Sequence, residues 1–86
     1  MSNNQMVAME KTLPAVVLDD QTVMFDGRNL SGIDEVAEAI RLVMEREPHF
    51  VLFIEGVPEK HWEGIGTVIY GSNQAGFDLD NLRHSW

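Results

Sequence analysis

The segment SGIDEVAEAIRLVMEREPHFVLFIE, residues 31–55, carries the clearest structural signal in the chain. In its first part apolar residues recur every three or four positions, which places them on one face of a helix. They are Ile33, Val36, Ala37, Ile40, Val43 and Met44. Ser31 is suited to cap the first turn, and Pro48 disfavours helical geometry at the residue before it. The pattern therefore predicts a helix over residues 31–47.

The second part of this segment predicts a strand over residues 49–55. Phe50, Leu52 and Ile54 alternate with Val51 and Phe53, so both faces of the strand are apolar. We expect this strand to lie in the middle of the sheet. It is either covered on both faces, or covered on one face and paired with a second copy on the other.

Upstream, the residues indicate a hairpin. Residues 15–18 and 22–25 are short β-prone runs separated by the polar residues 19–21, a suitable hairpin loop. Asp26-Gly27 supplies a second turn, because glycine accepts a positive φ. Residues 1–13 are expected to form a flexible N-terminal arm, and residues 14–86 a single domain.

Downstream, a second helix is predicted over residues 59–74. Its expected inner stripe consists of Trp62, Ile65, Val68, Ile69 and Ser72. Three glycines inside it lower the helix propensity and are expected to let the helix approach the sheet closely. Gly76 is predicted to end the helix in a left-handed conformation, with Phe77 folding back onto it. Residues 79–83 are expected to form a weak edge strand.

Together these elements predict an α+β fold in the order β-β-α-β-α-β. The sheet is expected to have three or four strands and to be covered on one face by two helices, since each amphipathic helix needs an apolar surface. A chain of 86 residues with 44% hydrophobic content fits one small domain.

Composition excludes several classes of function. Fourteen acidic residues against six Lys and Arg give a formal net charge of −8, which argues against nucleic-acid and anionic-membrane binding. The chain has no cysteine, so disulfides and thiolate chemistry are excluded. The longest apolar run, residues 50–54, is far too short to cross a bilayer, and no secretory signal is visible. We expect a soluble cytoplasmic protein.

The run DQTVMFDGRNL, residues 20–30, resembles the hairpin of the soluble, periplasmic-type domain of the ExbD/TolR family. The similarity continues through residues 50–54, Trp62 in the place of a family aromatic, and the closing Ala75-Gly76-Phe77. It covers about residues 15–77. The resemblance implies a scaffold that mediates dimerisation and contacts with partner proteins.

The chain departs from this family in one respect that bears on function. Family members carry a transmembrane helix whose aspartate couples to the proton-motive force, and the sequence contains no such helix. The energy-transducing role is therefore not carried over. The family's soluble domain has no catalytic residue, so none is assigned here.

No residue pattern predicts catalysis, a metal site or a cofactor. His49, His61 and His84 are not spaced as metal ligands. The glycines at 64, 66 and 71 lie inside a helical pattern rather than in a phosphate-binding loop. Glu55 and His61 form the one conceivable acid–base pair, without an accompanying nucleophile or oxyanion donor.

The sequence thus predicts a non-enzymatic protein-interaction module, expected to be a homodimer, that binds through a sheet edge or an acidic helix face. The candidate contact residues are Val16, Leu18, Val23, Phe25, Glu38, Glu45, Trp62, Leu79 and Leu82. Two alternatives stay open. One is an acidic inhibitor or decoy, such as a mobile-element protein, that blocks a basic site on a host protein. The other is a small enzyme using Glu55 and His61.

Overall fold

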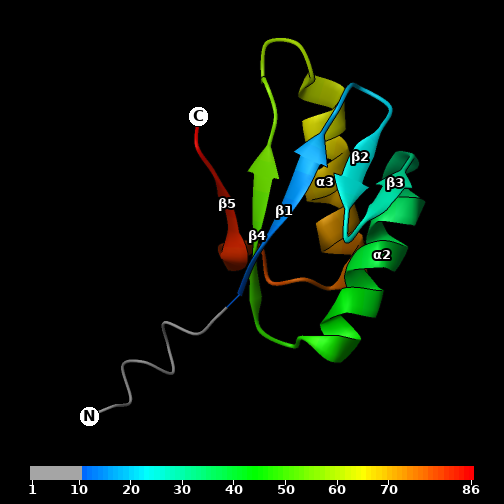
Figure 1. Cartoon of the computed structure of the whole chain (residues 1–86), viewed down its shortest axis with the longest axis vertical. Helices are drawn as coiled ribbons and strands as arrows, with labels where there is room; N and C mark the ends of the chain where they lie inside the picture. The colour runs from blue at the N-terminus through cyan, green and yellow to red at the C-terminus, as the bar shows by residue number, and fades with distance from the viewer. Residues whose placement is uncertain (1–10) are drawn as a thin grey trace.

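The computed structural model describes residues 11–86, which form a five-stranded sheet and two helices (Figure 1). The elements in chain order are β1 (Lys11–Val17), β2 (Val23–Phe25), β3 (Arg28–Leu30), α2 (Gly32–Arg46), β4 (Phe50–Glu55), α3 (Trp62–Ala75), a 3-10 turn η1 (Leu79–Asn81) and β5 (Leu82–His84). The predicted α+β class is confirmed. Among the described residues no helix is long and apolar enough to span a membrane.

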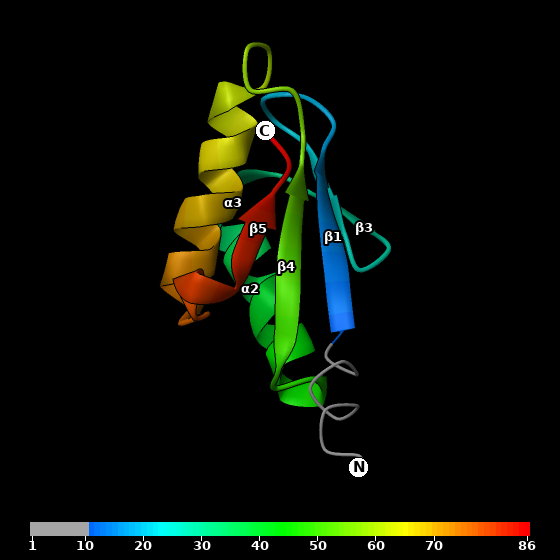
Figure 2. The same ribbon diagram turned by 90° about the vertical axis from the view of Figure 1, so that its left-hand side faces the viewer.

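The strands lie in the order β3-β2-β1-β4-β5. β2 runs antiparallel to both β1 and β3, whereas β4 runs parallel to β1 and β5. Both helices cover the same side of the sheet, and in the described part of the chain no helix lies on the other side (Figures 1 and 2). Two expectations need correction: the sheet has five strands rather than three or four, and its central strand is β1 rather than β4.

The two turns of the N-terminal β-meander form as predicted. The backbone N–H of Leu18 donates to the carbonyl of Thr22 at 2.9 Å, which closes the loop between β1 and β2. Asp26 and Gly27 both have positive φ, 54° and 73°, as a tight two-residue hairpin turn requires. This turn leads into β3, which the sequence did not predict because its three residues include a single apolar one, Leu30.

Helix α2 agrees with its prediction within one residue at either end. Its buried side consists of Val36, Ala37, Ala39, Ile40 and Val43. Ile33, expected on that side, is exposed in the first turn. Ser31 precedes the helix, and its backbone N–H donates to the Glu35 carboxylate at 2.8 Å.

Helix α3 is packed closely at two glycines. A Cβ on Gly64 would lie 2.5 Å from Val17 Cγ1, and one on Gly71 would lie 2.7 Å from Val36 Cγ1. The predicted close approach is therefore confirmed at Gly64 for the sheet, while Gly71 instead meets α2. The end of α3 is also as predicted: Gly76 has φ 82°, and the N–H of Phe77 donates to the Ser72 carbonyl at 3.0 Å.

The inner stripe predicted for α3 is partly wrong. Ile65, Val68 and Ser72 are buried, but Trp62 and Ile69 are exposed. The helix is apolar on two sides, and the side that carries Gly64 and Gly71 is the one that fits against the sheet and α2. The buried Ser72 hydroxyl is satisfied by donating to the Val68 carbonyl at 2.7 Å.

Both ends of the predicted domain also differ from expectation. Residues 11–13, predicted to belong to the arm, are part of β1, and the rest of that predicted arm lies outside the described residues. The predicted strand over residues 79–83 is a 3-10 turn followed by β5. Asp78 starts that turn by accepting a hydrogen bond from the backbone N–H of Asp80 at 3.0 Å.

Candidate functional site

The central strand β1 is flanked differently along its length. β4 pairs with Lys11–Val16, whereas β2 pairs only with Ala15–Val17. On the β2 side, residues 11–14 therefore face no strand among the described residues. We call residues 11–14 the free half of β1. Pro14 lies in this half, where its missing N–H removes no bond to β2.

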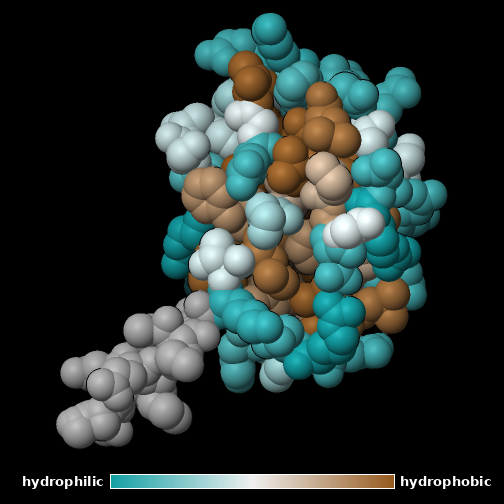
Figure 3. Space-filling model, in the orientation of Figure 1, coloured by the Kyte–Doolittle hydropathy of each residue, from teal (hydrophilic) through white to brown (hydrophobic). Residues whose placement is uncertain are grey.

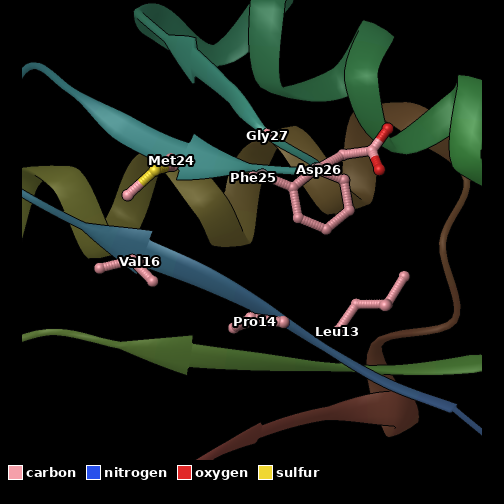
Figure 4. Close-up of a pocket in the computed structure, with 7 residues that line it drawn as sticks. All are labelled: Leu13, Pro14, Val16, Met24, Phe25, Asp26 and Gly27. Carbon is pink, nitrogen blue, oxygen red and sulfur yellow. The ribbon is translucent and has the colours of Figure 1, made fainter.

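An apolar hollow of about 300 Å³ adjoins this free half (Figure 4). β1 and β2 supply its walls, and the turn into β3 supplies one end. Its lining residues are Leu13, Pro14, Val16, Met24, Phe25, Asp26 and Gly27. Figure 4 shows the side chains of Leu13 and Phe25 extending toward the space beside β1 at the end of β2. A carboxylate, from Asp26, is the one charged group in this lining.

Two ion pairs fix the borders of this site. Lys11 Nζ lies 2.9 Å from a carboxylate oxygen of Glu47, just beyond α2. Arg46 in the last turn of α2 lies 3.2 Å from a carboxylate oxygen of Asp26, in the turn that ends the hollow. The pairs are largely exposed and contribute little stability, but they tie both borders to the same end of α2.

The hollow opens onto the side of the sheet that no helix covers. In Figure 3 the hydrophobic side chains gather in the middle of this face and hydrophilic ones lie around its rim. Val16 and Met24 are directly paired in register, and Val51 and Phe53 of β4 are half-buried rather than buried. An apolar side chain that entered the hollow would therefore meet an apolar surface on both sides.

The structure separates the residues predicted for the hairpin edge. Val16 lines the hollow, and Leu18 is exposed in the loop after β1. Val23 and Phe25, predicted as contact residues, are instead buried in the core on the helix side. They therefore support the sheet rather than offer an outer surface. Phe25 reaches the hollow as part of its lining.

The other predicted contact residues lie on separate surfaces. Glu38 and Glu45 are exposed on α2, and Glu38 accepts a hydrogen bond from Arg41 at 2.8 Å. Trp62 is exposed at the start of α3. Leu79 is exposed in η1, whereas Leu82 in β5 is half-buried against the core. The structure therefore does not bring the predicted residues together into one site.

The two outer edges of the sheet are short. β3 and β5 each contain three residues. The Arg83 side chain donates to the Leu82 carbonyl at 2.9 Å and also to the Asp80 carbonyl, so backbone acceptors near this edge already have a donor. Beside β3 lies an open groove of about 440 Å³ shared with Asp34, Glu35 and Glu38 of α2.

The loop before β2 holds the one carboxyl group whose ionisation is clearly altered. The backbone N–H of Gln21 donates to Asp19 Oδ1 at 2.8 Å, and this bond is the main reason that the pKa of Asp19 lies below its ordinary value. Desolvation opposes this effect and raises the pKa, while hydrogen bonds from Thr22 and electrostatic attraction to the nearby His61 lower it by smaller amounts. His61 Nδ1 itself is buried without a hydrogen-bond partner.

Residues 11–86 contain no group of three His, Asp or Glu side chains placed to hold a metal ion. Glu55 is exposed at the end of β4, and His61 is half-buried just before α3. Neither residue lines the hollow beside β1 or the groove beside β3.

Five lining residues were not among the predicted contacts: Leu13, Pro14, Met24, Asp26 and Gly27. A signal for Leu13 and Pro14 was present: residues 13–18 are apolar on both sides of Pro14, whereas the apolar run of the second strand is Val23–Phe25, so the first strand is longer than its hairpin partner. Pro14 within that run also indicates a strand with one unpaired side.

Comparisons of the chain with protein-family models, with curated proteins and with solved structures find no match.

Proposed function

We propose that this chain is a non-enzymatic protein-interaction module that accepts an extended segment of a partner protein beside the free half of β1. The observation that carries the proposal is the mismatch between β1 and β2, which within residues 11–86 leaves residues 11–14 with a strand on one side only. The apolar hollow at the same position supports it. The resemblance to the ExbD/TolR soluble domain, where partner contacts are expected, supports a binding role as well.

The proposed binding has two components. The backbone N–H and C=O of Thr12 pair with the incoming strand, because alternate residues of β1 direct these groups to the β2 side, as Val16 and Leu18 do. This pairing supplies affinity without regard to sequence. Pro14 offers its carbonyl and no N–H, which limits how far the ladder can extend. One apolar side chain of the partner enters the hollow between Pro14 and Met24, and this contact supplies selectivity.

A displayed library of random peptides, selected on the chain, provides the probe for this proposal. Selected peptides are expected to be extended, with one large apolar residue. Met24→Glu is expected to weaken their binding about tenfold or more, because a charge would be buried against the ligand. Leu42→Glu on α2 is the matched control, since Leu42 is 38% exposed and Met24 is 40% exposed.

The outcomes separate the possible occupants of the site. Loss of peptide binding with Met24→Glu and not with Leu42→Glu supports the proposal. Equal loss with both variants, or none with either, contradicts it. If the chain dimerises and Met24→Glu alone makes it monomeric in light scattering, the occupant is a second copy, as the expected homodimer implies.

The groove beside β3 favours a second candidate function, the acidic decoy. Asp34, Glu35 and Glu38 of α2 line that groove together with one cation, Arg28 of β3, so its lining is acidic on balance. Such a row of carboxylates suits a basic site on another protein. Binding through it is expected to weaken steeply with added salt and to be reduced by Glu38→Gln, whereas strand pairing at β1 is expected to resist salt.

A further inference from the structure

The outer side of α3 carries an aromatic surface that the fold does not use. Trp62 is 67% exposed and Tyr70 65% exposed, two turns apart on the same side of the helix. Gly66 lies between them, one turn from each. Together with Ile65 and Ile69 they line a hollow of about 300 Å³. We call this hollow the α3 groove.

Packing of the domain does not explain the groove. The side of α3 that contacts the sheet and α2 consists of other residues: Gly64, Ile65, Val68, Gly71 and Ser72 are buried. Only Ile65 belongs to both sets. Exposed Trp and Tyr are also the residue types that contribute most at protein interfaces, because they bury a large area for few rotatable bonds.

No charged residue lines the groove, and most of the charged residues near it in the sequence are acidic. From His61 to Leu82 the sequence contains no Lys or Arg, but it contains Glu63, Asp78 and Asp80. Glu59 precedes this stretch, and Lys60 is the single nearby base. The groove therefore lies in the negative field of a chain whose formal net charge is −8.

We propose that the α3 groove binds a cationic segment of a partner protein by placing an arginine side chain against Trp62 and Tyr70. A guanidinium stacks on indole and phenol rings, and it is more weakly hydrated than the ammonium of lysine. Gly66 leaves room for the incoming group, since it has no side chain. A second copy is a poor occupant, because each copy carries a formal net charge of −8 and the two would repel each other.

This surface is separate from the free half of β1, and none of its lining residues is shared with the hollow there. Either proposal can therefore fail alone.

The probes for the α3 groove are three acetylated, amidated peptides of one length that alternate glycine with arginine, lysine or citrulline. Their binding is followed by NMR titration of the Trp62 and Trp86 indole N–H signals and by calorimetry.

The arginine peptide is expected to bind most tightly and to shift the Trp62 indole signal, and citrulline, which lacks the charge, is expected to bind least. Trp62→Ala and Tyr70→Ala are each expected to weaken binding about five- to tenfold. Trp86→Ala is the matched control, because Trp86 is an exposed indole that does not line the groove.

Two further variants test the shape and the charge of the groove. A Cβ on Gly66 would meet only Tyr70 Cε2, at 3.9 Å, so Gly66→Leu is expected to fill the groove without disturbing the fold and to abolish the Trp62 shift. Glu63→Gln is expected to weaken binding more than Glu45→Gln, which removes the same charge from α2.

The proposal is overturned by any of four results. The citrulline peptide binds as well as the arginine peptide; Trp62→Ala and Tyr70→Ala bind like the unaltered chain; or Glu63→Gln and Glu45→Gln weaken binding equally, which would indicate diffuse attraction to the net charge. A concentration-dependent dimer that Trp62→Ala dissociates would assign the groove to a second copy and would also overturn it.

Discussion

The two halves of β1 have the same backbone conformation and opposite surroundings. Ala15 pairs with both β2 and β4, Val17 pairs with β2, and both are buried under the helices. Lys11 and Thr12 pair with β4 alone and are exposed. The paired half, residues 15–17, is explained by folding. The free half keeps an extended shape with one side unpaired among the described residues. An apolar hollow lies where the free half meets the paired half.

This contrast suggests that folding and binding are divided along a single strand. Strand edges with unpaired N–H and C=O groups are liable to pair with other chains, so proteins usually shorten or cover them. The outer strands β3 and β5 are short, as that pressure would produce. The free half of β1 is an interior gap instead, bordered by the ion pairs of Lys11 and Asp26.

The largest expected effect compares two neighbours on β2. Phe25→Ala is expected to lower the free energy of unfolding by about 3–4 kcal/mol, because it removes a buried ring opposite Ala15. Met24→Ala, on the uncovered face, is expected to cost less than about 1 kcal/mol. Urea denaturation of both variants measures the difference. Equal costs would show that the two faces of β2 are equally important for stability.

The next effect tests the packing at the end of the paired half. Gly64→Ala is expected to cost about 2 kcal/mol, because the added Cβ would lie 2.6 Å from the Asp19 carbonyl oxygen. Gly66→Ala in the same helix is expected to gain up to about 1 kcal/mol, since alanine favours helix and meets no close atom. Thermal unfolding compares them. A stabilised Gly64→Ala would contradict the close approach of α3 to β1.

A smaller effect concerns the ion pair at the start of the free half. Lys11→Met is expected to change the free energy of unfolding by less than about 1 kcal/mol, because Lys11 and Glu47 are largely in solvent. The effect on β1 itself should be larger than the effect on global stability: amide hydrogen exchange in β1 is expected to become faster. High salt should produce the same faster exchange in the unaltered chain, because it screens the ion pair. No change in exchange would show that the pair does not restrain the strand.

The smallest effect is a pH dependence at Asp19. Its pKa is lower in the folded chain, chiefly because the Gln21 N–H donates to the carboxylate. The resulting stabilisation is fully present above the unfolded-state pKa and is lost as pH falls through the folded-state pKa. Asp19→Asn is therefore expected to lower the Tm slightly at neutral pH and not at strongly acidic pH. A deficit that grows on acidification would contradict this assignment.

Sequence reasoning predicted the elements whose signals are local. The period of α2, the alternation in β4, the Asp26-Gly27 turn and the Gly76 cap each depend on nearby residues. β3 was missed because its three residues become a strand only by pairing with β2. β1, rather than β4, is central because two strands lie on each side of it, which a pattern within one strand cannot show.

The candidate binding surfaces were predicted less well, for a similar reason. Trp62 and Ile69 share a helical period with the core, and only the fit of Gly64 and Gly71 against their neighbours decides which side of α3 is buried. The free half of β1 depends on where β2 ends relative to β1. Both features are relations between elements, so a single-sequence pattern does not contain them.

Amide hydrogen exchange along β1, with and without a selected peptide, tests the proposed strand pairing most directly. In the isolated chain, amides in Lys11–Leu13 that do not bond to β4 should exchange rapidly, and those in Ala15–Val17 slowly. Addition of the peptide should protect the rapid group and leave the slow group unchanged. Protection that appears instead at β3 or β5, with no change in Lys11–Leu13, would contradict the proposal.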